Sequence, residues 1–371
     1  MHALIIGGGI AGISTAMTLT GLGVDVDLVE RDQEIRTLGS GITLIAPALR
    51  ALDNLGVLPA CLDAGYGTSE LQIWDASGAT LATMPLRSPL GSDLPGIMGM
   101  MRPTLHRILL ETAADRGLTV RTGLTPSTVD SDENGASVTF SDGTRSSFDL
   151  VIGADGLRST IREQVCGPNR PDFLGQACYR AVLPRPEAVS SEVAFVGHPT
   201  THIGFTPTGA DSMYLYCLVP VDTPPRPAAE DLPAIIREYL APFGGVVAEL
   251  RELITDPTTV NCVSLETIVA PEPWYRGRTV LVGDSAHATT PHLAAGAAMC
   301  LEDAIALGEE LGQQGSVPEA LAAYSKRRYQ RCQYVVETSK QLLYWQTHPG
   351  TPDADQEGLR AAAINVLSGP F

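Results

Sequence analysis

The first feature of the sequence that could do chemistry is a glycine-rich segment near its start, Gly-Gly-Gly-Ile-Ala-Gly at residues 7–12. Three of its glycines match the pattern G-x-G-x-x-G. In that pattern Gly7 allows a tight turn, Gly9 lets the backbone approach a pyrophosphate, and Gly12 lets a helix pack against its strand. A helix that begins at such a turn directs unpaired N–H groups and the positive end of its dipole at a phosphate. We therefore predict that five residues contact a dinucleotide: Gly7, Gly9, Ile10, Ala11 and Gly12.

Glu30 lies where a dinucleotide-binding carboxylate is expected. Apolar spacing favours a strand at 3–6, a helix at 10–22 and a second strand at 24–29, which together form a Rossmann-type βαβ unit. At the end of the second strand, a carboxylate accepts hydrogen bonds from ribose hydroxyls and disfavours a 2′-phosphate. The alternative is a solvated charge at a strand end.

A second motif, Asp155–Arg162, directly follows the apolar strand Leu150–Ile152. A strand that ends in Gly-Ala-Asp-Gly brings backbone and a carboxylate to the edge of a sheet, where the ligands of α/β proteins bind. The alternative is an ordinary helix start in which Ser159 and Arg162 are solvated.

A third motif, Gly283–His287, follows a predicted strand at 279–282 and places Asp284 at the carboxyl end of that strand. Pro291 and a run of small residues at 294–298 come next. Small residues let a flat ring lie against the start of the following helix, whose N-terminus would stabilise negative charge on a reduced ring.

These three motifs, in this order, resemble those of the single-component flavoprotein aromatic hydroxylases, the group that includes para-hydroxybenzoate and salicylate hydroxylases. The resemblance covers nearly the whole chain, and the stretch 283–303 is most similar to the salicylate hydroxylases. Further matching residues lie between the motifs: Glu30-Arg31, Gly39–Ile42, Arg102 with Leu105 and Leu109, and Trp274–Gly277.

The resemblance implies that the glycine-rich segment and Glu30 hold the ADP half of FAD. Arg31 and Arg102 would steady the ribose and pyrophosphate region. Asp155 would lie near the pyrophosphate and take part in docking of the nicotinamide cofactor.

The resemblance also assigns the flavin end of the cofactor. Asp284 would bind the ribityl chain, while Gly296 and Ala297 would face the isoalloxazine. Pro291 would line the site where oxygen reacts, which makes Pro291 and the neighbouring His292 the candidate catalytic residues.

The sequence departs from the family pattern in two places. The usual Gly-Gln-Gly after the proline is Ala294-Ala295-Gly296, and the usual Asn is Ala298. Where relatives often have Pro-Asn, this chain has Ala46-Pro47. These changes concern flavin mobility and oxygen activation more than the binding of FAD.

The resemblance implies a monooxygenase in which FAD takes hydride from NADH or NADPH, reacts with O2 and hydroxylates an electron-rich aromatic molecule through a flavin C4a-hydroperoxide. Because the chain has one dinucleotide fingerprint, the nicotinamide cofactor would bind transiently. Two alternatives stay open. One is a related flavoenzyme that performs epoxidation, Baeyer–Villiger oxidation or antibiotic inactivation, and the other is a flavin-binding protein without catalysis.

The predicted fold is α/β, α+β overall: a Rossmann-type FAD-binding domain with an inserted antiparallel β-sheet substrate domain and a helical C-terminal segment. The FAD-binding domain would comprise residues 1–70, 96–168 and 269–371. Residues 71–95 and 169–268, where prolines cluster and short alternating stretches appear, would form the substrate domain.

Other elements follow from apolar spacing. Helices are predicted at 47–55, 103–116 and 231–241, a β-meander at 128–152, and a long helical stretch from 296 to about 343. The last twenty residues carry only a weak pattern.

The substrate pocket would be lined by polar residues of the 169–268 sheet. Tyr214 and Tyr216 share one face of a strand and His202 lies on a neighbouring strand. The full set of candidates also includes residues elsewhere in the sheet: Tyr179, Arg180, His198 and Cys217.

Composition limits the partners. With 42 acidic and 25 basic residues the net charge is −17, which disfavours nucleic acid and anionic membranes. No apolar run approaches the roughly 18 residues of a membrane span. The seven cysteines form no Cys-x-x-Cys pair, and His287 and His292 lack a helical i, i+4 register, so no metal site is predicted. We expect a cytoplasmic monomer or homodimer whose partners are a small aromatic molecule and O2.

Overall fold

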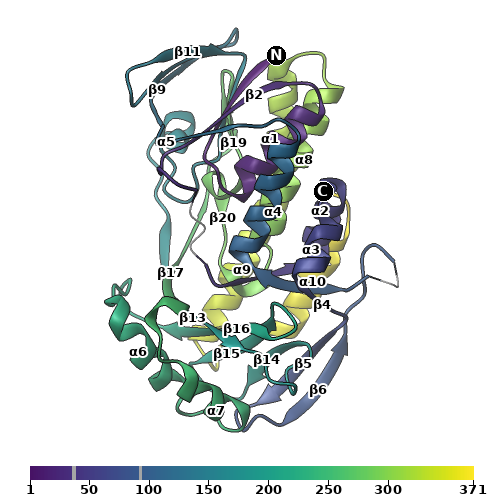
Figure 1. Ribbon diagram of the computed structural model, residues 1–371, viewed down its shortest axis with the longest axis vertical. Helices are drawn as coiled ribbons and strands as arrows, with labels where there is room; N and C mark the ends of the chain where they lie inside the picture. The colour runs from purple at the N-terminus through teal and green to yellow at the C-terminus, as the bar shows by residue number, and fades with distance from the viewer. Residues whose placement is uncertain (36–38, 92–93) are drawn as a thin grey trace.

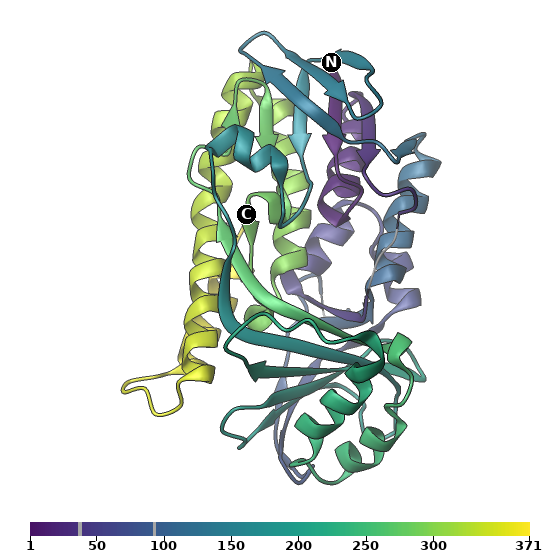
Figure 2. The same cartoon turned by 90° about the vertical axis from the view of Figure 1, so that its left-hand side faces the viewer.

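The computed structural model describes residues 1–35, 39–91 and 94–371. Figure 1 shows an upper part in which helices run alongside a mainly parallel sheet, and a lower part in which a larger sheet lies above two short helices. The long strands β13 (Asp172–Pro184) and β17 (Val260–Val269) run between the two parts, as Figure 2 shows.

A six-stranded sheet forms the upper part, in the spatial order β18-β19-β12-β1-β2-β8. β1 lies parallel to both β2 and β12, β2 lies parallel to β8, and β12 lies parallel to β19, whereas β18 pairs with β19 in the antiparallel direction. This order confirms the predicted strand–helix–strand start and brings β19, from late in the chain, beside β12. The strands are β1 (His2–Ile6), β2 (Asp25–Glu30), β8 (Val120–Thr122), β12 (Leu150–Gly153), β18 (Tyr275–Arg276) and β19 (Thr279–Leu281).

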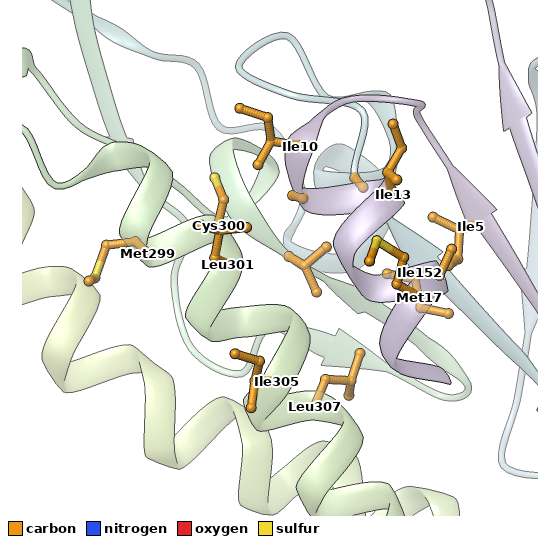
Figure 3. Packing of buried hydrophobic residues seen from close by; sticks show 14 of the residues in the cluster. Ile5, Ile10, Ile13, Met17, Ile152, Met299, Cys300, Leu301, Ile305 and Leu307 are labelled. Carbon is orange, nitrogen blue, oxygen red and sulfur yellow. The ribbon is translucent and has the colours of Figure 1, made fainter. Parts of the chain in front are cut away.

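Helices α1 (Ile10–Gly21) and α8 (Gly296–Gln313) pack against each other on this sheet. Each buried aliphatic side chain in such a contact contributes about 1.5–3 kcal/mol to stability. The contact therefore joins the N-terminal βαβ unit firmly to a helix from the last fifth of the chain. Figure 3 shows the side chains that meet there, including Ile10, Ile13, Met17, Cys300, Leu301 and Ile305.

A small antiparallel sheet, in the order β3-β7-β4, lies below the parallel sheet. The predicted helices at 47–55 and 103–116 are confirmed as α2 and α4. Each has a proline in its first turn, where the missing N–H costs nothing. The elements of this region are β3 (Gly41–Ile45), α2 (Ala46–Asn54), α3 (Leu58–Ala64), β4 (Tyr66–Thr68), β7 (Ile97–Met101) and α4 (Arg102–Asp115).

The prediction of one β-meander at 128–152 is wrong in its last strand. β9 (Pro126–Ser131), β10 (Ala136–Phe140) and β11 (Arg145–Phe148) form a three-stranded antiparallel sheet, but β12 leaves it and inserts between β1 and β19. All four residues of β12 are buried. A short, continuous apolar run of this kind is typical of a strand covered on both faces of a parallel sheet.

The lower sheet has eight strands, in the order β20-β17-β13-β16-β15-β14-β5-β6. Its pairs are antiparallel except for β14 with β5, which confirms the predicted antiparallel sheet and the mixed fold class. The predicted domain boundaries stay a prediction, although β5 and β6 pair with strands from the 169–268 segment as that division requires. The remaining strands are β5 (Glu70–Asp75), β6 (Thr80–Pro85), β14 (Glu192–Val196), β15 (His202–Pro207), β16 (Ser212–Pro220) and β20 (His287–Ala288).

Helices cover the outer face of this sheet, and the C-terminal helices run along the molecule. The predicted helix at 231–241 is confirmed as α6 (Leu232–Leu240), and α7 (Val246–Leu253) follows it. The predicted helical stretch 296–343 is two helices, α8 and α9 (Val317–Thr347), and the weakly patterned end forms α10 (Gln356–Ser368). Among the helices of the described ranges, none is long and apolar enough to cross a membrane.

A buried cluster of charges ties α8, α9 and the loop after β19 together. Asp303 accepts hydrogen bonds from the Gly283 N–H at 2.7 Å, His287 Nε2 at 2.6 Å and Arg328 Nε at 2.7 Å. Arg328 also donates to Glu302 at 2.9 Å. Burial alone would raise the pKa of Asp303, but His287 and Arg328 lower it to about 2. The same pairing raises the pKa of His287 well above its ordinary value in spite of burial, so both partners are ionised at neutral pH.

Replacing Arg328 by methionine should destabilise the fold by about 3–5 kcal/mol, because the buried carboxylates of Asp303 and Glu302 would lose their shared cation and keep only His287 and Arg331, respectively. Urea unfolding of Arg328→Met against the wild type measures the change. Arg237→Met, which breaks an exposed pair with Glu252, is the matched control and should cost at most about 1 kcal/mol. Equal stability of the Arg328 and Arg237 variants would contradict the role of the cluster.

Candidate active site

The glycine-rich turn between β1 and α1 has the shape that a phosphate site requires. Gly7 has a φ of +112°, and a Cβ on Gly12 would lie 1.9 Å from the Gly7 carbonyl oxygen, so neither position accepts a side chain. A Cβ on Gly9 would meet no atom within 4 Å. The backbone of α1 is therefore open at its first turn, which has no side-chain cap, and the free N–H groups there fit a pyrophosphate.

Glu30 and His106 fix this turn from two sides. The Gly8 N–H donates to Glu30 Oε2 at 2.8 Å, and the Asp32 N–H donates to Oε1 at 3.0 Å. His106 on α4 donates from Nε2 to the Gly8 carbonyl at 2.6 Å. The Glu30 carboxylate thus lies at the end of β2 beside the turn, half-buried, where a ribose would be bound. His106, which the sequence did not single out, is buried for this structural reason.

Two further predicted cofactor residues come together at the junction of α4 with the third motif. Asp284 lies in the single turn after β19, and Arg102 is the first residue of α4. Burial raises the pKa of Asp284, while the positive charges of Arg102 and His287 oppose the shift. Arg102 itself is exposed, and Arg31 is exposed beside Asp32, 3.5 Å away. Arg102 and Asp284 therefore lie close enough for their charges to interact.

In the structure, Asp155 stabilises the start of the helix that follows it. Its carboxylate accepts hydrogen bonds from the Thr160 N–H at 2.7 Å, the Ile161 N–H at 3.2 Å and the Ser159 hydroxyl, so it caps α5 (Thr160–Cys166). The turn that it stabilises follows β12 and adjoins the glycine-rich turn, because Gly7 packs against the Ala154 carbonyl. Its predicted contact with the nicotinamide cofactor stays a prediction.

The alternative in which Ser159 and Arg162 are solvated is wrong. Both are buried, and Arg162 donates to the Ser285 carbonyl at 3.1 Å and to the Leu157 carbonyl at 2.9 Å. Arg162 thereby connects the second motif to the third, which explains why the two occur together. The guanidinium loses solvation on burial, which lowers its pKa, but the two carbonyls keep it bound in place.

The turn Pro291–Leu293 leads into α8 and leaves its N-terminus open. Ala294 has a positive φ of +51°, and α8 starts at Gly296 without a side-chain cap. A Cβ on Gly296 would touch only Thr289, at 3.6 Å. The first-turn N–H groups of Gly296 and Ala297 are therefore free for a ligand. This arrangement fits a flat ring whose negative charge the helix N-terminus stabilises.

His292 uses both ring nitrogens inside the protein. Nδ1 lies 2.9 Å from the Thr290 hydroxyl and Nε2 lies 3.0 Å from Gln346 Oε1, so Nε2 carries the proton and Nδ1 accepts. Burial and the nearby Arg360 lower the pKa of His292 to about 3. Arg360 also donates to the His292 carbonyl. A neutral ring bound in this way positions the turn, and its predicted catalytic role stays untested.

The predicted substrate residues divide between the two faces of the lower sheet. Met213, Leu215 and Cys217 point to the face covered by α6 and α7, so Tyr214 and Tyr216 point to the opposite, inner face. The inner face lies towards the upper part of the molecule, where β3 and the turn Pro291–Leu293 are. Tyr214 contacts β3 through Gly41.

The structure places Arg180 and His202 on the inner face but not Tyr179. Tyr179 packs on the outer face, where its ring centroid lies 5.5 Å from that of Tyr239 on α6. His198 lies near the same side, 5.4 Å from the Phe243 ring. Sequence alternation alone separated Tyr179 from Arg180, but it did not say which of them faces the upper part. Tyr179, His198 and Cys217 are therefore removed from the predicted cluster.

The inner face also carries polar groups that the sequence did not single out. Glu192, Thr206 and Thr43 form hydrogen bonds in series with Tyr214. Glu192 begins the alternating strand Glu192–Val196, and its position out of phase with the apolar Val193 and Phe195 was a usable indication that it lies on the opposite face. Nothing in the sequence pointed to Thr43, because its partner is on a different part of the chain.

Three further groups form a tight buried set. The ligand atoms of His287, Asp303 and Cys332 lie within 4.8 Å of one another. The His287–Asp303 distance of 2.6 Å is that of a hydrogen bond, and Arg328 donates to both Asp303 and Cys332. The positive charge in this set thus comes from protein side chains.

Comparison with known proteins identifies the family to which these turns belong. Residues 1–339 match the family described as "FAD binding domain". The chain belongs to this FAD-binding family. It is 35% identical over 342 residues to 2-heptyl-3-hydroxy-4(1H)-quinolone synthase of Pseudomonas aeruginosa, covering 91% of this chain and 88% of that protein. It is 30% identical over 356 residues to 3-hydroxybenzoate 6-hydroxylase of Polaromonas naphthalenivorans, covering 92% and 87%.

A solved structure agrees over the whole length. A variant of Klebsiella pneumoniae HpxO complexed with FAD superimposes with a TM-score of 0.89 at 26% identity, covering 100% of this chain and 99% of that one. The resemblance to flavoprotein aromatic hydroxylases is thereby confirmed, as are the FAD cofactor and the assignment to FAD-dependent monooxygenases.

In this FAD-binding protein, we expect Glu30→Ala to weaken FAD binding by about 1–3 kcal/mol. The variant loses the hydrogen bond to the Gly8 turn and the ribose hydrogen bonds that the resemblance assigns to Glu30. Titration of the apoprotein with FAD, followed by flavin fluorescence, gives the affinity. Asp27→Ala on the same strand removes an exposed carboxylate as the control. Wild-type affinity in Glu30→Ala would contradict the assignment.

We expect Asp284→Ala to release or loosen FAD, because the variant would lose the carboxylate to which the resemblance assigns the hydrogen bonds with the ribityl chain. Asp284→Asn keeps an acceptor oxygen and should retain more FAD than the alanine variant. The flavin-to-protein absorbance ratio after gel filtration measures both. Full flavin content in Asp284→Ala would remove the residue from the site.

Proposed function

We propose that this protein is an NAD(P)H-dependent monooxygenase that hydroxylates an aromatic or similarly electron-rich small molecule on the inner face of its eight-stranded sheet. The observation that carries the proposal is that the N-terminus of α8 lies near the inner face of the eight-stranded sheet. The uncapped N-terminus of α8, where the flavin ring fits, follows the turn of His292, and His202 of the sheet face acts electrostatically on that histidine. Within the described ranges His202 Nε2 is buried without a hydrogen-bond partner. Bound FAD, once reduced by the nicotinamide cofactor, supplies one atom of O2 to the substrate while the other leaves as water.

Three side chains of the inner face are available to a substrate. His202 Nε2 is buried without a hydrogen-bond partner, and Arg180 forms no hydrogen bond or ion pair within the described ranges. Tyr216 lies opposite Arg180 in the strand register, and its hydroxyl likewise has no partner in the part of the chain that the structure describes. A buried nitrogen without a partner costs about 1–3 kcal/mol, which a ligand hydrogen bond would recover.

These groups favour a substrate with an acidic or carbonyl oxygen on its ring. Arg180 and Arg360 add positive charge near Tyr214 and Tyr216 respectively, which suits a partly anionic ligand. Compounds of this kind appear in the names or structures of the relatives: a 3-hydroxy-4(1H)-quinolone that a synthase makes, 3-hydroxybenzoate for a hydroxylase and, in a complex with HpxO, uric acid. We propose the same class of compound here and place the chemistry between α8 and the inner face.

The protein's own groups act by positioning and charge. The turn held by Arg360, Thr290 and Gln346 sets the start of α8, whose N–H groups stabilise negative charge on the ring. The sheet and β3 exclude water from the opposite side. The nicotinamide cofactor would bind transiently near Asp155, as predicted.

Purified protein should be yellow and should oxidise NADH or NADPH faster in the presence of a hydroxybenzoate, hydroxyquinolone or purine, with a product heavier by one oxygen atom. Tyr216→Phe should raise KM about tenfold through loss of a substrate hydrogen bond. Tyr179→Phe, on the outer face, is the control and should match the wild type. A yellow protein that no panel member stimulates would support the flavin-binding alternative without catalysis, and a colourless protein that binds no FAD would refute both.

A further inference from the structure

Four side chains from four strands form hydrogen bonds in series across the junction of the two parts of the molecule. Thr206 Oγ1 on β15 donates to Glu192 Oε1 on β14 at 2.9 Å. Thr43 Oγ1 on β3 lies 3.2 Å from Thr206 Oγ1 and 2.9 Å from the Tyr214 hydroxyl on β16. The series therefore runs without a gap from a phenol to a carboxyl group, and three of its members belong to the inner face of the sheet.

The number of protons that each hydroxyl can donate determines which group is the donor in each hydrogen bond of the series. Each hydroxyl has one proton to donate. Because Thr206 gives its proton to an ionised Glu192, it accepts from Thr43, and Thr43 in turn accepts from Tyr214. The Tyr214 oxygen then has a lone pair free to accept from a ligand. When Glu192 is protonated the whole series can reverse, so the same four groups carry a proton either way.

Close packing holds the middle of the series in place. The Tyr214 ring lies so near β3 that a Cβ on Gly41 would come within 1.9 Å of it. The methyl group of Thr206 lies against Gly99 on β7, where a Cβ would come within 2.4 Å. Neither contact leaves room for a side chain to move between the hydroxyls. The hydrogen-bonded geometry is therefore set by the backbones of both parts.

Glu192 can both release and accept a proton near neutral pH, and its ionised, proton-accepting form becomes the major one above about pH 8. Burial of the carboxyl raises its pKa to about 8, against a lowering by the Thr206 hydrogen bond. The phenols of Tyr214 and Tyr216 face it from β16, and burial raises the pKa of Tyr214 to about 12. No cation neutralises it among the described groups that act on it. On the neighbouring strands the same face carries His202 of β15 and the apolar Leu71 of β5.

We propose that Tyr214, Thr43, Thr206 and Glu192 form a proton relay that removes the proton from an acidic O–H or N–H group of the bound substrate. The inference rests on the proposed function. In the forward step the substrate proton passes to the Tyr214 oxygen, and the Tyr214 proton passes to Thr43. The Thr43 proton passes to Thr206, and the Thr206 proton passes to the Glu192 carboxylate. Each hydroxyl gains one proton and gives one, the substrate becomes an anion, and Glu192 becomes a carboxylic acid.

The relay serves hydroxylation because an anionic ring is more electron-rich than the neutral one and is attacked more readily by an electrophilic oxygen. A general base works best when its pKa lies near the operating pH. Glu192 is half-buried as a residue, so its proton can leave to solvent after each turnover. Arg180, on the same face, would favour the anionic form of the substrate.

Removal of one hydroxyl from the middle of the relay tests it. Thr206→Val keeps the side-chain shape and should lower kcat for a phenolic substrate of the panel by about 100-fold at pH 7. The loss should shrink as the pH approaches the substrate's own pKa, because the anion then forms in solution. Thr206→Ser restores the hydroxyl and should recover most of the rate, and Glu192→Gln should behave like the valine variant. FAD content and flavin reduction by NAD(P)H check that each variant is folded.

Thr208→Val is the matched control, since it removes a buried threonine hydroxyl directly after β15 that forms a hydrogen bond with Ser212 and none with the relay. It should keep the wild-type pH profile. Wild-type kcat in Thr206→Val would overturn the relay and leave the monooxygenase function intact. An equal loss in the valine and serine variants without recovery at high pH would also overturn it, in favour of a structural contact. A wild-type protein that hydroxylates no panel member would overturn both proposals.

Discussion

The upper part of the molecule, with the parallel sheet and the helices beside it, depends on the hydrogen bonds and ion pairs of the ionised Asp303 carboxylate. This carboxylate accepts from the Gly283 backbone, from His287 and from Arg328, and so joins the turn after β19 to α8 and α9. A carboxylate with no solvent around it is stable only when such partners are complete. Because Asp284 lies in the same turn and α8 begins with an uncapped N-terminus at Gly296, the position of both follows from this one cluster.

The site is assembled from strand ends that are far apart in the sequence. β1, β12 and β19 are neighbours in the parallel sheet, so their carboxyl ends bring together the glycine-rich turn, the Asp155 turn and the Asp284 turn. Arg162 fastens the second of these to the third through the Ser285 carbonyl. The order of the strands, rather than any local segment, therefore creates a continuous path for a long cofactor along one edge of the sheet.

The pKa values of two carboxyl groups, those of Asp303 and Glu192, are shifted in opposite directions. Asp303 has its pKa lowered to about 2 by adjacent positive charges, and it stays ionised to hold the fold. Glu192 has only a threonine hydroxyl as partner, and burial raises its pKa to about 8. The first suits a permanent structural charge, whereas the second suits a group that gains and loses a proton. The difference comes from whether a cation lies beside the carboxyl group, since burial by itself raises the pKa of both.

Local pattern alone determined the βαβ start, the open glycine turn and Glu30, because turn geometry and strand ends depend on residues close in sequence. It also led to the resemblance and hence to FAD. Only the tertiary structure decided that Tyr179 faces away from the site while Arg180 faces it. Both faces of β13 are covered, and alternation in the sequence does not tell which face packs on α6 and α7 and which faces the site. It likewise decided that Arg162 is buried and that Thr43 completes a series with Thr206. Such contacts join distant strands, and their pairing is fixed by sheet order and packing rather than by neighbours along the chain.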